Sequence, residues 1–334
     1  MLRGVFALLF AAALAVAGGV YNDYRHFINT PLSPLDKTTT LQIALGTPLP
    51  GILHELETHG IHPGPPLYWR VLTRRMHVQG KLHAGEYSLE PGMTPRGLLN
   101  MMAKNKVIQH QFTIVDGWTF EQLRDALTEN DELRHTLAGE DDEDIMRALG
   151  SPDTPPEGWF LPETYNFVRG MSDMDILRRS HEAMQRELKR VWASRDENLP
   201  LDTPYQALIL ASIVEKETAR ADERARIAGV FVHRLELGMK LQTDPTVIYG
   251  MGSHYDGNLR RKDLETDTPF NTYTRTGLPP TPIALPGVPA LVAVAHPART
   301  DALYFVARGD GTHEFSKTLR AHDRAVDKYQ LHRK

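Results

Sequence analysis

The pattern of apolar residues predicts a buried helix near the middle of the chain, over residues 205–214. Thr203 is placed as an N-cap, and Pro204 takes the first helical position, where its missing N–H has no consequence. The segment has no wide polar face, which indicates a helix inside the protein rather than on its surface. It ends at two carboxylates, Glu215 and Glu217. These carboxylates either mark where the helix reaches solvent or carry chemistry.

Alternation of polar and apolar residues predicts a small module toward the N-terminus. The expected order is a strand, two helices and a returning strand, followed by a further helix after Pro95, at residues 39–45, 48–59, 67–76, 85–89 and 95–102. So short a β-α-α-β sequence suggests an independent module, which we bound at residues 41–105.

The remaining chain, residues 106–334, predicts a larger mixed α+β domain. Its expected elements are a strand at 108–115, helices at 120–127, 131–149, 173–195, 223–237, 289–296 and 318–331, and a hairpin at 303–315. Asp222 is the expected cap of the helix at 223–237. Residues 250–289 are rich in Gly, Pro and Thr and are expected to be irregular, which in a compact domain is usually a sign of function or disorder.

The N-terminal residues 4–21 form an uncharged, mostly apolar run of 18 residues. That length is just enough to span a bilayer. Residues 15–17, Ala-Val-Ala, resemble a signal-peptidase site, so a cleaved signal peptide is the alternative. Because the run stays apolar to its end, we favour an uncleaved anchor at residues 1–22 and a proline-punctuated tether at 23–40. Arg3 favours a cytoplasmic N-terminus, with the bulk of the protein outside.

Composition excludes several classes of function. The formal net charge of -4 argues against nucleic acid as the main partner. The absence of cysteine rules out disulfides and thiolate metal sites. His54 and His59 are five residues apart, whereas a helical zinc motif needs four, so no metal is expected. The chain has neither a nucleophile elbow nor a phosphate-binding loop, so serine-hydrolase and nucleotide chemistry lack support.

The two carboxylates at the end of the central helix are not equivalent. They lie two residues apart, so they point roughly 200° away from each other and cannot form a paired-carboxylate site. Small residues, Ala211 and Ser212, precede Glu215 by one turn and leave room for a ligand on that face. Glu217 follows bulky apolar residues and is expected at a rim. The residues alone therefore prefer Glu215 as a functional group but leave a structural role open.

Short sequence motifs occur over nearly all of the chain after the tether. They occupy residues 83–87, 91–94, 157–165, 210–218, 241–250, 273–280, 295–298 and 303–306. Together they resemble the motifs of the endolytic murein transglycosylases of the MltG/YceG-like family, in the order that this family has them. The resemblance is specific because no single motif carries it.

The resemblance implies an inner-membrane protein, single-pass, whose periplasmic part cleaves nascent peptidoglycan strands internally and so ends their elongation. The implied fold is α+β, with an N-terminal transmembrane helix, a LysM-like βααβ module within residues 41–105 and a catalytic domain over residues 106–334. The implied partners are peptidoglycan glycan strands, the inner membrane and, as candidates, peptidoglycan synthases. Cofactors, metals and nucleic acid are not implied.

The family's catalytic residue is the first glutamate of its Ile-Val-Glu-Lys-Glu motif, which is Glu215 here. Hydrolytic glycosidases usually need two carboxylates, and substrate-assisted families are the exceptions. By hypothesis, Glu215 protonates the glycosidic oxygen between MurNAc and GlcNAc while the N-acetyl group stabilises the cation. It then takes the proton of the MurNAc C6 hydroxyl as that oxygen attacks C1, which leaves a 1,6-anhydro end. Burial of the helix end would supply a suitable pKa.

Three further residues in family motifs, Glu157, Asn271 and Tyr249, are expected to contact substrate. Each has a structural alternative, because the polar pair could hold loops by local hydrogen bonds and the tyrosine could belong to the core. The rival to the enzyme is a membrane-anchored peptidoglycan-binding scaffold in which Glu215 is structural. A plain hydrolase, which would leave reducing ends, is the third alternative. The sequence does not distinguish denuded from peptide-bearing strands.

Overall fold

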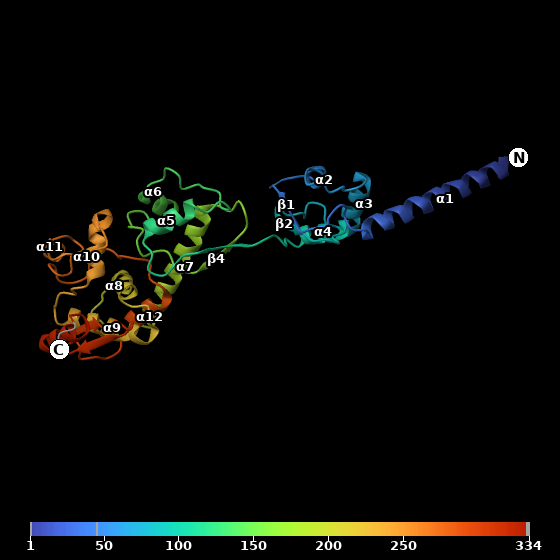
Figure 1. The fold of residues 1–334 in the computed structure, drawn as a ribbon. Helices are drawn as coiled ribbons and strands as arrows, with labels where there is room; N and C mark the ends of the chain where they lie inside the picture. Colours follow the sequence, from blue (N-terminus) through green and yellow to red (C-terminus); the bar gives the residue numbers. More distant parts are fainter. Residues whose placement is uncertain (1, 45, 332–334) are drawn as a thin grey trace. The chain divides into compact units, whose positions relative to one another are not determined.

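Buried apolar side chains form two separate clusters, one in each of two units of the chain. The computed structural model describes residues 2–44 and 46–331 (Figure 1). Leu45, the expected end of the first strand, and the outermost residues of the expected anchor and of the expected catalytic domain, Met1 and 332–334, lie outside the described residues. The first unit comprises Met1–His110 with Asn166–Gly170, and the second comprises Gln111–Tyr165 with Met171–Lys334.

The first unit follows the predicted β-α-α-β order. Its elements are α1 (Leu2–Asn29), β1 (Thr39–Ile43), α2 (Leu49–Thr58), α3 (Pro66–Met76), β2 (Gly85–Leu89) and α4 (Pro95–Ala103). β1 and β2 pair antiparallel, with Leu41 opposite Tyr87, and both of these side chains are fully buried. The βααβ order is thus confirmed, whereas the likeness of this module to LysM remains a prediction.

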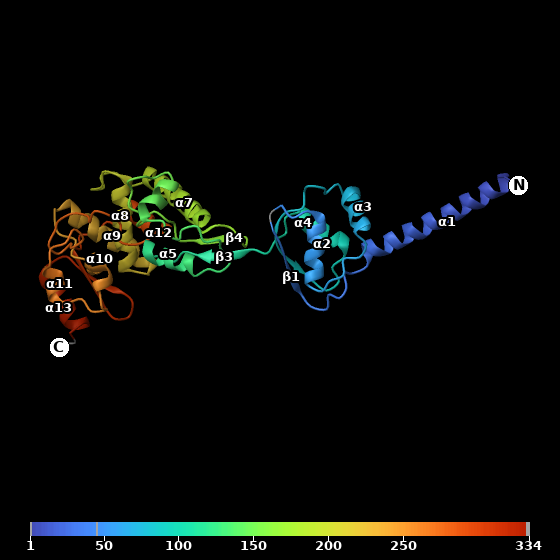
Figure 2. The ribbon, with the colours of Figure 1, turned by 90° about the horizontal axis from the view of Figure 1, so that it is seen from above.

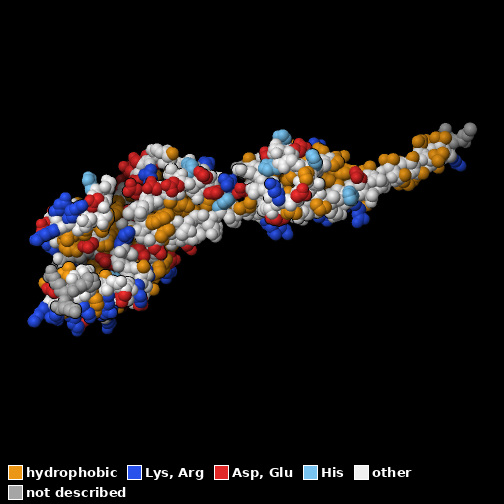
Figure 3. Space-filling model, in the orientation of Figure 1, with side chains coloured by type: hydrophobic (Ala, Val, Ile, Leu, Met, Phe, Trp, Pro, Cys, Tyr) orange, Lys and Arg blue, Asp and Glu red, His pale blue; other side chains and the backbone are white. Residues whose placement is uncertain are grey.

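The N-terminal helix α1 is longer than the apolar run that predicted it. From Arg3 to Asn29 it is long and apolar enough to cross a membrane, and its apolar window is not covered by other parts of the protein. Figure 3 shows hydrophobic side chains along its length. Its composition fits a single-pass membrane helix, as expected.

The expected tether at residues 23–40 is wrong in its first part. The helix continues to Asn29, and Tyr24, Ile28, Leu32 and Leu35 are all buried in the core of the first unit. The physical reason is the spacing of the apolar residues: Tyr24 and Ile28 lie four apart and share one face of the helix, which packs on α3 and α4. The segment anchors the module on the helix rather than linking the two loosely.

This packing predicts a stability effect for a residue of the expected tether. Leu32 is 4% exposed, so Leu32→Ala should lower the free energy of unfolding of the first unit by about 2–5 kcal/mol. Hydrogen exchange of first-unit peptides in increasing urea measures the change. Leu67→Ala is the matched control, because Leu67 is 64% exposed, and it should change stability by less than about 0.5 kcal/mol. Equal effects of the two variants would restore the view of a free tether.

The second unit is mostly helical, with short strands. Its elements, together with the strands on which the chain passes between the units, are β3 (His110–Thr113), α5 (Phe120–Thr128), α6 (Asp142–Ala148), β4 (Thr164–Phe167), α7 (Asp173–Ala193), α8 (Pro204–Glu217), α9 (Ala221–Glu236), α10 (Asp244–Met251), the short 3₁₀ helix Gly252–His254, α11 (Arg261–Glu265), α12 (Val288–Ala295), β5 (Tyr304–Ala307), β6 (His313–Ser316) and α13 (Leu319–Tyr329). β3 pairs with β4, and β5 with β6. The mixed α+β prediction is confirmed.

The predicted central helix, α8, lies in the core of the second unit. Thr203 accepts a hydrogen bond from the Gln206 amide as its N-cap, and every residue from Ala207 to Val214 is buried. α8 packs against α7, α9, α10 and α12, and Figure 2 shows α7, α9 and α12 around it. The hydrophobic effect therefore fixes α8, and with it the position of the two glutamates at its end.

Two local predictions in this unit are wrong, and a third needs a small correction. Only Asp142–Ala148 of the expected helix at 131–149 is helical, because the like charges of residues 140–144 gather at a helix N-terminus, where the dipole favours them (red in Figure 3, over α6). Arg220, not Asp222, is the N-cap of α9, and Asp222 pairs with it from the first turn. The stretch at 250–289 is mostly irregular, as expected, but it also contains the end of α10, the 3₁₀ helix, α11 and the start of α12.

Candidate functional site

The last turn of α8 presents Glu215 and Glu217 to different surroundings, as their spacing predicts. The Glu215 side chain is 6% exposed. Its Oε2 accepts a hydrogen bond of 3.0 Å from the amide of Gly287. Its Oε1 lies 3.8 Å from a guanidinium nitrogen of Arg224, on α9. The carboxylate is therefore buried, held through one oxygen by a backbone donor and faced on the other by a cation.

The small residues before Glu215 have a different use from the one expected. They do not leave room for a ligand: Ala211 and Ser212 are fully buried beneath the chain that leads to Gly287. The Ser212 hydroxyl accepts a hydrogen bond of 3.0 Å from the Ile283 amide. One turn later on α8, Glu215 accepts a hydrogen bond from the Gly287 amide. Small side chains on this face thus let a backbone segment run along α8 and deliver an N–H group to Glu215.

Gly287 approaches the Asp116 side chain closely because it lacks a side chain of its own. A Cβ there would lie 2.4 Å from Oδ1 of Asp116. The turn that holds Asp116 is tied to the same segment, since Gly117 donates to the Leu285 carbonyl at 2.9 Å and the Leu285 amide donates to the Trp118 carbonyl at 2.7 Å. Asp116, the Gly287 backbone and Glu215 therefore form one close arrangement.

Burial raises the pKa of Glu215, and the nearby Asp116 carboxylate adds to the rise. The Gly287 hydrogen bond and the charges of Arg224 and Lys216 act in the opposite direction. Lys216 is held in place by a hydrogen bond of 3.1 Å to the Gly117 carbonyl. The net upward shift favours a carboxyl group that stays protonated closer to neutral pH than an ordinary glutamate.

Glu217 is not the rim residue that the sequence suggested. It accepts a hydrogen bond from the Thr243 hydroxyl and lines a pocket of about 560 Å³ with Arg234, Asp244 and His313. Burial raises the pKa of Glu217 to about 6. The bulky residues before it on α8, Ile213 and Val214, are fully buried in the core.

Glu157 and Tyr249, both expected substrate contacts, meet in another pocket of the second unit. The Tyr249 hydroxyl donates to Glu157 Oε2 at 3.1 Å, and the Phe120 amide at the start of α5 donates to Oε1 at 3.1 Å. Burial raises the pKa of Glu157 to about 7. Both side chains line a pocket of about 1030 Å³ that also contains the aromatic residues Tyr255 and Phe270.

A short backbone segment, from Gly117 to Phe120, connects the surroundings of Glu215 with the pocket of Glu157. Gly117 lies against the Glu215 side chain, because a Cβ added to Gly117 would be 3.8 Å from Cγ of Glu215. Three residues later, the amide of Phe120 donates to Glu157. Three residues span at most about 11 Å. The backbone from Gly117 to Phe120 therefore joins the surroundings of Glu215 to the lining of this pocket.

The raised pKa of Glu157 predicts how stability changes with pH. The protonated acid is favoured in the folded state, so stability is fully present below the unfolded-state pKa of 4.5 and falls as pH rises toward about 7. The loss should be on the order of 3 kcal/mol, at 1.36 kcal/mol per unit. Glu157→Gln should remove most of this fall, because its amide stays neutral. Urea unfolding at pH 5 and 7.5 measures it, and an unchanged pH dependence in the variant would contradict the assignment.

Asn271 is placed differently from the other expected contacts. It is 1% exposed, and its Nδ2 donates to the carbonyls of Asp263, Leu264 and Thr266 at 2.6–3.2 Å. Its Oδ1 accepts from the Tyr273 amide at 2.8 Å. Every polar atom of the side chain is thus engaged with the backbone, which favours the alternative of a residue that holds its loop.

Sequence reasoning missed the groups that touch Glu215 from elsewhere: Asp116, Gly117, Arg224 and Gly287. Asp116 and Gly117 lie between the expected strand at 108–115 and the expected helix at 120–127, where no periodic pattern marks them. Gly287 lay within the stretch expected to be irregular, and no periodic pattern marks a glycine that is needed for close approach. Only the tertiary structure brings the three segments together.

Comparison with known proteins gives consistent matches. The sequence model of the YceG-like family matches residues 41–328. The endolytic murein transglycosylase of Bacillus subtilis is 33% identical over 263 residues, which are 74% of this chain and 72% of that protein. The endolytic murein transglycosylase of Streptococcus pneumoniae is 26% identical over 358 residues, and the match covers 96% of this chain but only 64% of that protein.

A solved structure also aligns with the chain. The crystal structure of a protein described as YceG-like, from Listeria monocytogenes, superposes with a TM-score of 0.53 at 28% sequence identity. The alignment covers 86% of this chain and 99% of that one. It therefore includes most of both units described above.

Proposed function

The chain belongs to the YceG-like family, and we propose that it is a lytic transglycosylase that cuts nascent peptidoglycan strands internally. Its relatives in Bacillus subtilis and Streptococcus pneumoniae carry the name endolytic murein transglycosylase, which supports an enzyme of the lyase type acting on peptidoglycan. The bond proposed for cleavage is the β-1,4 bond from MurNAc to GlcNAc, and the proposed product has a 1,6-anhydroMurNAc end.

The observation that carries this proposal is a buried carboxyl group, Glu215, with a raised pKa and one fixed backbone donor. The Gly287 N–H holds Oε2, so the transferable proton belongs on Oε1. A group that acts first as an acid and then as a base needs a pKa near the working pH. Burial moves Glu215 in that direction.

The proposed reaction uses Glu215 twice. Its proton passes from Oε1 to the glycosidic oxygen as the bond from that oxygen to C1 of MurNAc breaks. The N-acetyl carbonyl of the same sugar stabilises the positive charge at C1. The C6 hydroxyl oxygen then attacks C1, and its proton returns to Glu215. The enzyme is regenerated without water, which explains why one carboxylate suffices where hydrolysis commonly uses two.

The pocket of Glu157 and Tyr249 is the proposed site for sugars next to the cleaved bond. Its volume of about 1030 Å³ lies at the upper end of ordinary ligand pockets. It combines aromatic faces with polar groups, as sugar sites require. Glu157 and Tyr249 are the proposed contacts, whereas Asn271 is proposed to hold the loop that carries Tyr273.

The proposed location is the inner membrane, with α1 as a single-pass anchor and the catalytic part in the periplasm. The apolar length of α1 supports the anchor, and Arg3 before the apolar run supports this orientation. The βααβ module is proposed to be LysM-like. Peptidoglycan synthases are proposed partners, because nascent strands are the proposed substrate.

Digestion of defined glycan strands tests this function. The full chain in detergent micelles is incubated with denuded strands of uniform length, and the products are sized and analysed by mass spectrometry. Internal cleavage with anhydro ends is the expected result. Binding without release would support a scaffold, reducing ends would support a hydrolase, and release of disaccharides from one end only would refute endolytic action.

A further inference from the structure

The outer side of α3 carries exposed basic and apolar residues that the proposed function does not use. We call Leu67, Arg70, Val71, Arg74 and Arg75 the basic face of α3. All five side chains are exposed, Leu67 at 64% and Val71 at 39%. Within the described part of the chain, Arg70, Arg74 and Arg75 form no ion pair with a carboxylate. The face therefore offers three arginines that form no ion pair in that part of the chain, beside apolar surface, and Arg70 shares a second pocket with Glu57.

The basic face lies next to the point where α1 leaves its apolar run. Tyr68 on α3 donates to Asp23 Oδ2 at 2.7 Å. The guanidinium of Arg75 lies 6.0 Å from the ring centre of Tyr24. The apolar run of α1 ends at Tyr21, and a helix rises 1.5 Å per residue, so Tyr24 is only about 4.5 Å further along the axis. Both ends of α3 thus reach the same turn of α1, immediately beyond the apolar run.

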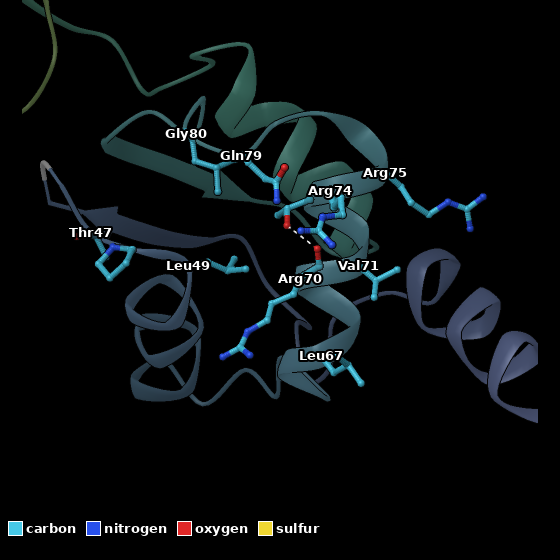
Figure 4. A pocket seen from close by; sticks show the side chains of 12 residues that line it. Thr47, Leu49, Leu67, Arg70, Val71, Arg74, Arg75, Gln79 and Gly80 are labelled. Carbon is cyan, nitrogen blue, oxygen red and sulfur yellow. Dashed lines mark hydrogen bonds between the residues drawn. The ribbon is translucent and has the colours of Figure 1, made fainter.

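The side chains of this face line a pocket of about 660 Å³. In Figure 4, Val71 and Arg75 point to the side of α3 on which α1 runs, and Arg70 points to the opposite side. Leu67, Val71 and Arg75 are four residues apart and follow one stripe of the helix. A stripe that alternates apolar and basic groups suits the boundary between lipid chains and headgroups.

The distribution of charge along the sequence agrees with this placement. Residues 1–110 contain 10 Lys and Arg against 6 Asp and Glu, whereas residues 111–334 contain 28 against 36. The basic excess therefore belongs to the unit that is packed on α1. Screening at physiological salt extends over about 8 Å, so the arginines nearest Tyr24 act on charges at a membrane surface.

We propose that the basic face of α3 binds the headgroups of anionic phospholipids in the bilayer that α1 crosses. The arginines bind the phosphates, and Leu67 and Val71 enter the interfacial layer. The module would then be fixed on the membrane surface through two contacts, the buried base of α1 and the face of α3. This inference rests on the proposed membrane anchor.

A fluorescent label on Val71 tests the proposal directly. The chain has no cysteine, so Val71→Cys takes a single environment-sensitive probe. The full chain is reconstituted in nanodiscs of phosphatidylcholine, with or without phosphatidylglycerol, and brominated lipid is used as quencher. We expect a blue shift and at least about two-fold stronger quenching with the anionic lipid, reduced by high salt. The control label is Gln42→Cys, at an exposed site on β1. Gln42 lies opposite Glu86 on β2, and the Glu86 carboxylate binds His110, at the point where the chain leaves the first unit.

Two charge-reversal variants of the labelled chain make the test specific. Arg70→Glu with Arg75→Glu should abolish the effect of anionic lipid, whereas Lys104→Glu with Lys106→Glu changes the same total charge and should preserve it. If the reversal misfolds by circular dichroism, Arg70→Gln with Arg75→Gln replaces it. A Val71 probe that stays in water in anionic discs, or quenching equal in both reversals, would overturn the proposal, as would a probe that responds only to added glycan strands. Failure of the chain to co-elute with the discs would refute the anchor instead.

Discussion

Glu215→Gln should lower the formation of anhydro-ended fragments by roughly 10³-fold or more, because the amide can neither give nor take the proton of either step. The fold should remain, since glutamine keeps an oxygen that accepts the Gly287 N–H, now 3.0 Å from Oε2. The rate is measured from anhydro-muropeptides by liquid chromatography and mass spectrometry. An unchanged melting temperature confirms that the variant is folded.

Glu217→Gln is the matched control on the same helix. The two residues differ in position by two and in direction by roughly 200°. Because the Glu217 carboxylate accepts a hydrogen bond from Thr243 and points away from Glu215, its amide variant should retain activity within about ten-fold of the wild type. Equal losses in both variants would mean that the substitutions damage the end of α8, and a larger loss at Glu217 would reverse the assignment.

The second large effect is expected at Gly287. A Cβ at this position meets Oδ1 of Asp116, so Gly287→Ala must shift the Asp116 carboxylate, the backbone amide that holds Glu215, or both. The φ of Gly287 is -75°, which alanine adopts without strain, so the effect comes from space alone. A misplacement of about 1 Å at a catalytic group can lower the rate by about 10²-fold, and we expect a loss of that size.

A double variant separates displacement from general damage. Asp116→Ala removes the atom with which the new Cβ collides, so Gly287→Ala with Asp116→Ala should recover most of the activity lost in Gly287→Ala alone. Such a non-additive result measures the coupling between the two residues. Steady-state cleavage rates of the two single variants and the double variant provide the cycle. Additive losses would show that the Gly287 amide acts independently of Asp116.

The elements that hydrophobic periodicity defines were predictable from the sequence. α8, with its cap at Thr203, and the βααβ order of the first unit follow directly from the pattern and from capping residues. The different surroundings of Glu215 and Glu217 follow from helical geometry alone. These features depend on residues close together in sequence, where the physics of propensity and spacing is local.

The features that were missed depend on contacts between distant segments. The small residues before Glu215 signalled a close approach, but the sequence could not tell a ligand from the backbone at Ile283 and Gly287. Residues 23–40 were predicted to be a tether because the role of Tyr24 and Ile28 becomes visible only when they are seen packed in the core of the module. Residues 131–141 are not helical as expected, and within this stretch the amides of Arg134 and Thr136 bond to Met171 and Asp173, which lie far away in the sequence.

In the proposed reaction the C6 hydroxyl of the substrate, and not water, attacks C1 with the help of Glu215 alone. Cleavage of glycan strands by the full chain in ¹⁸O-labelled water tests it most directly, with product ends read by mass spectrometry. We expect 1,6-anhydro ends that contain no ¹⁸O and that disappear in Glu215→Gln. Reducing ends that carry ¹⁸O would contradict it, because they would show that water is the nucleophile.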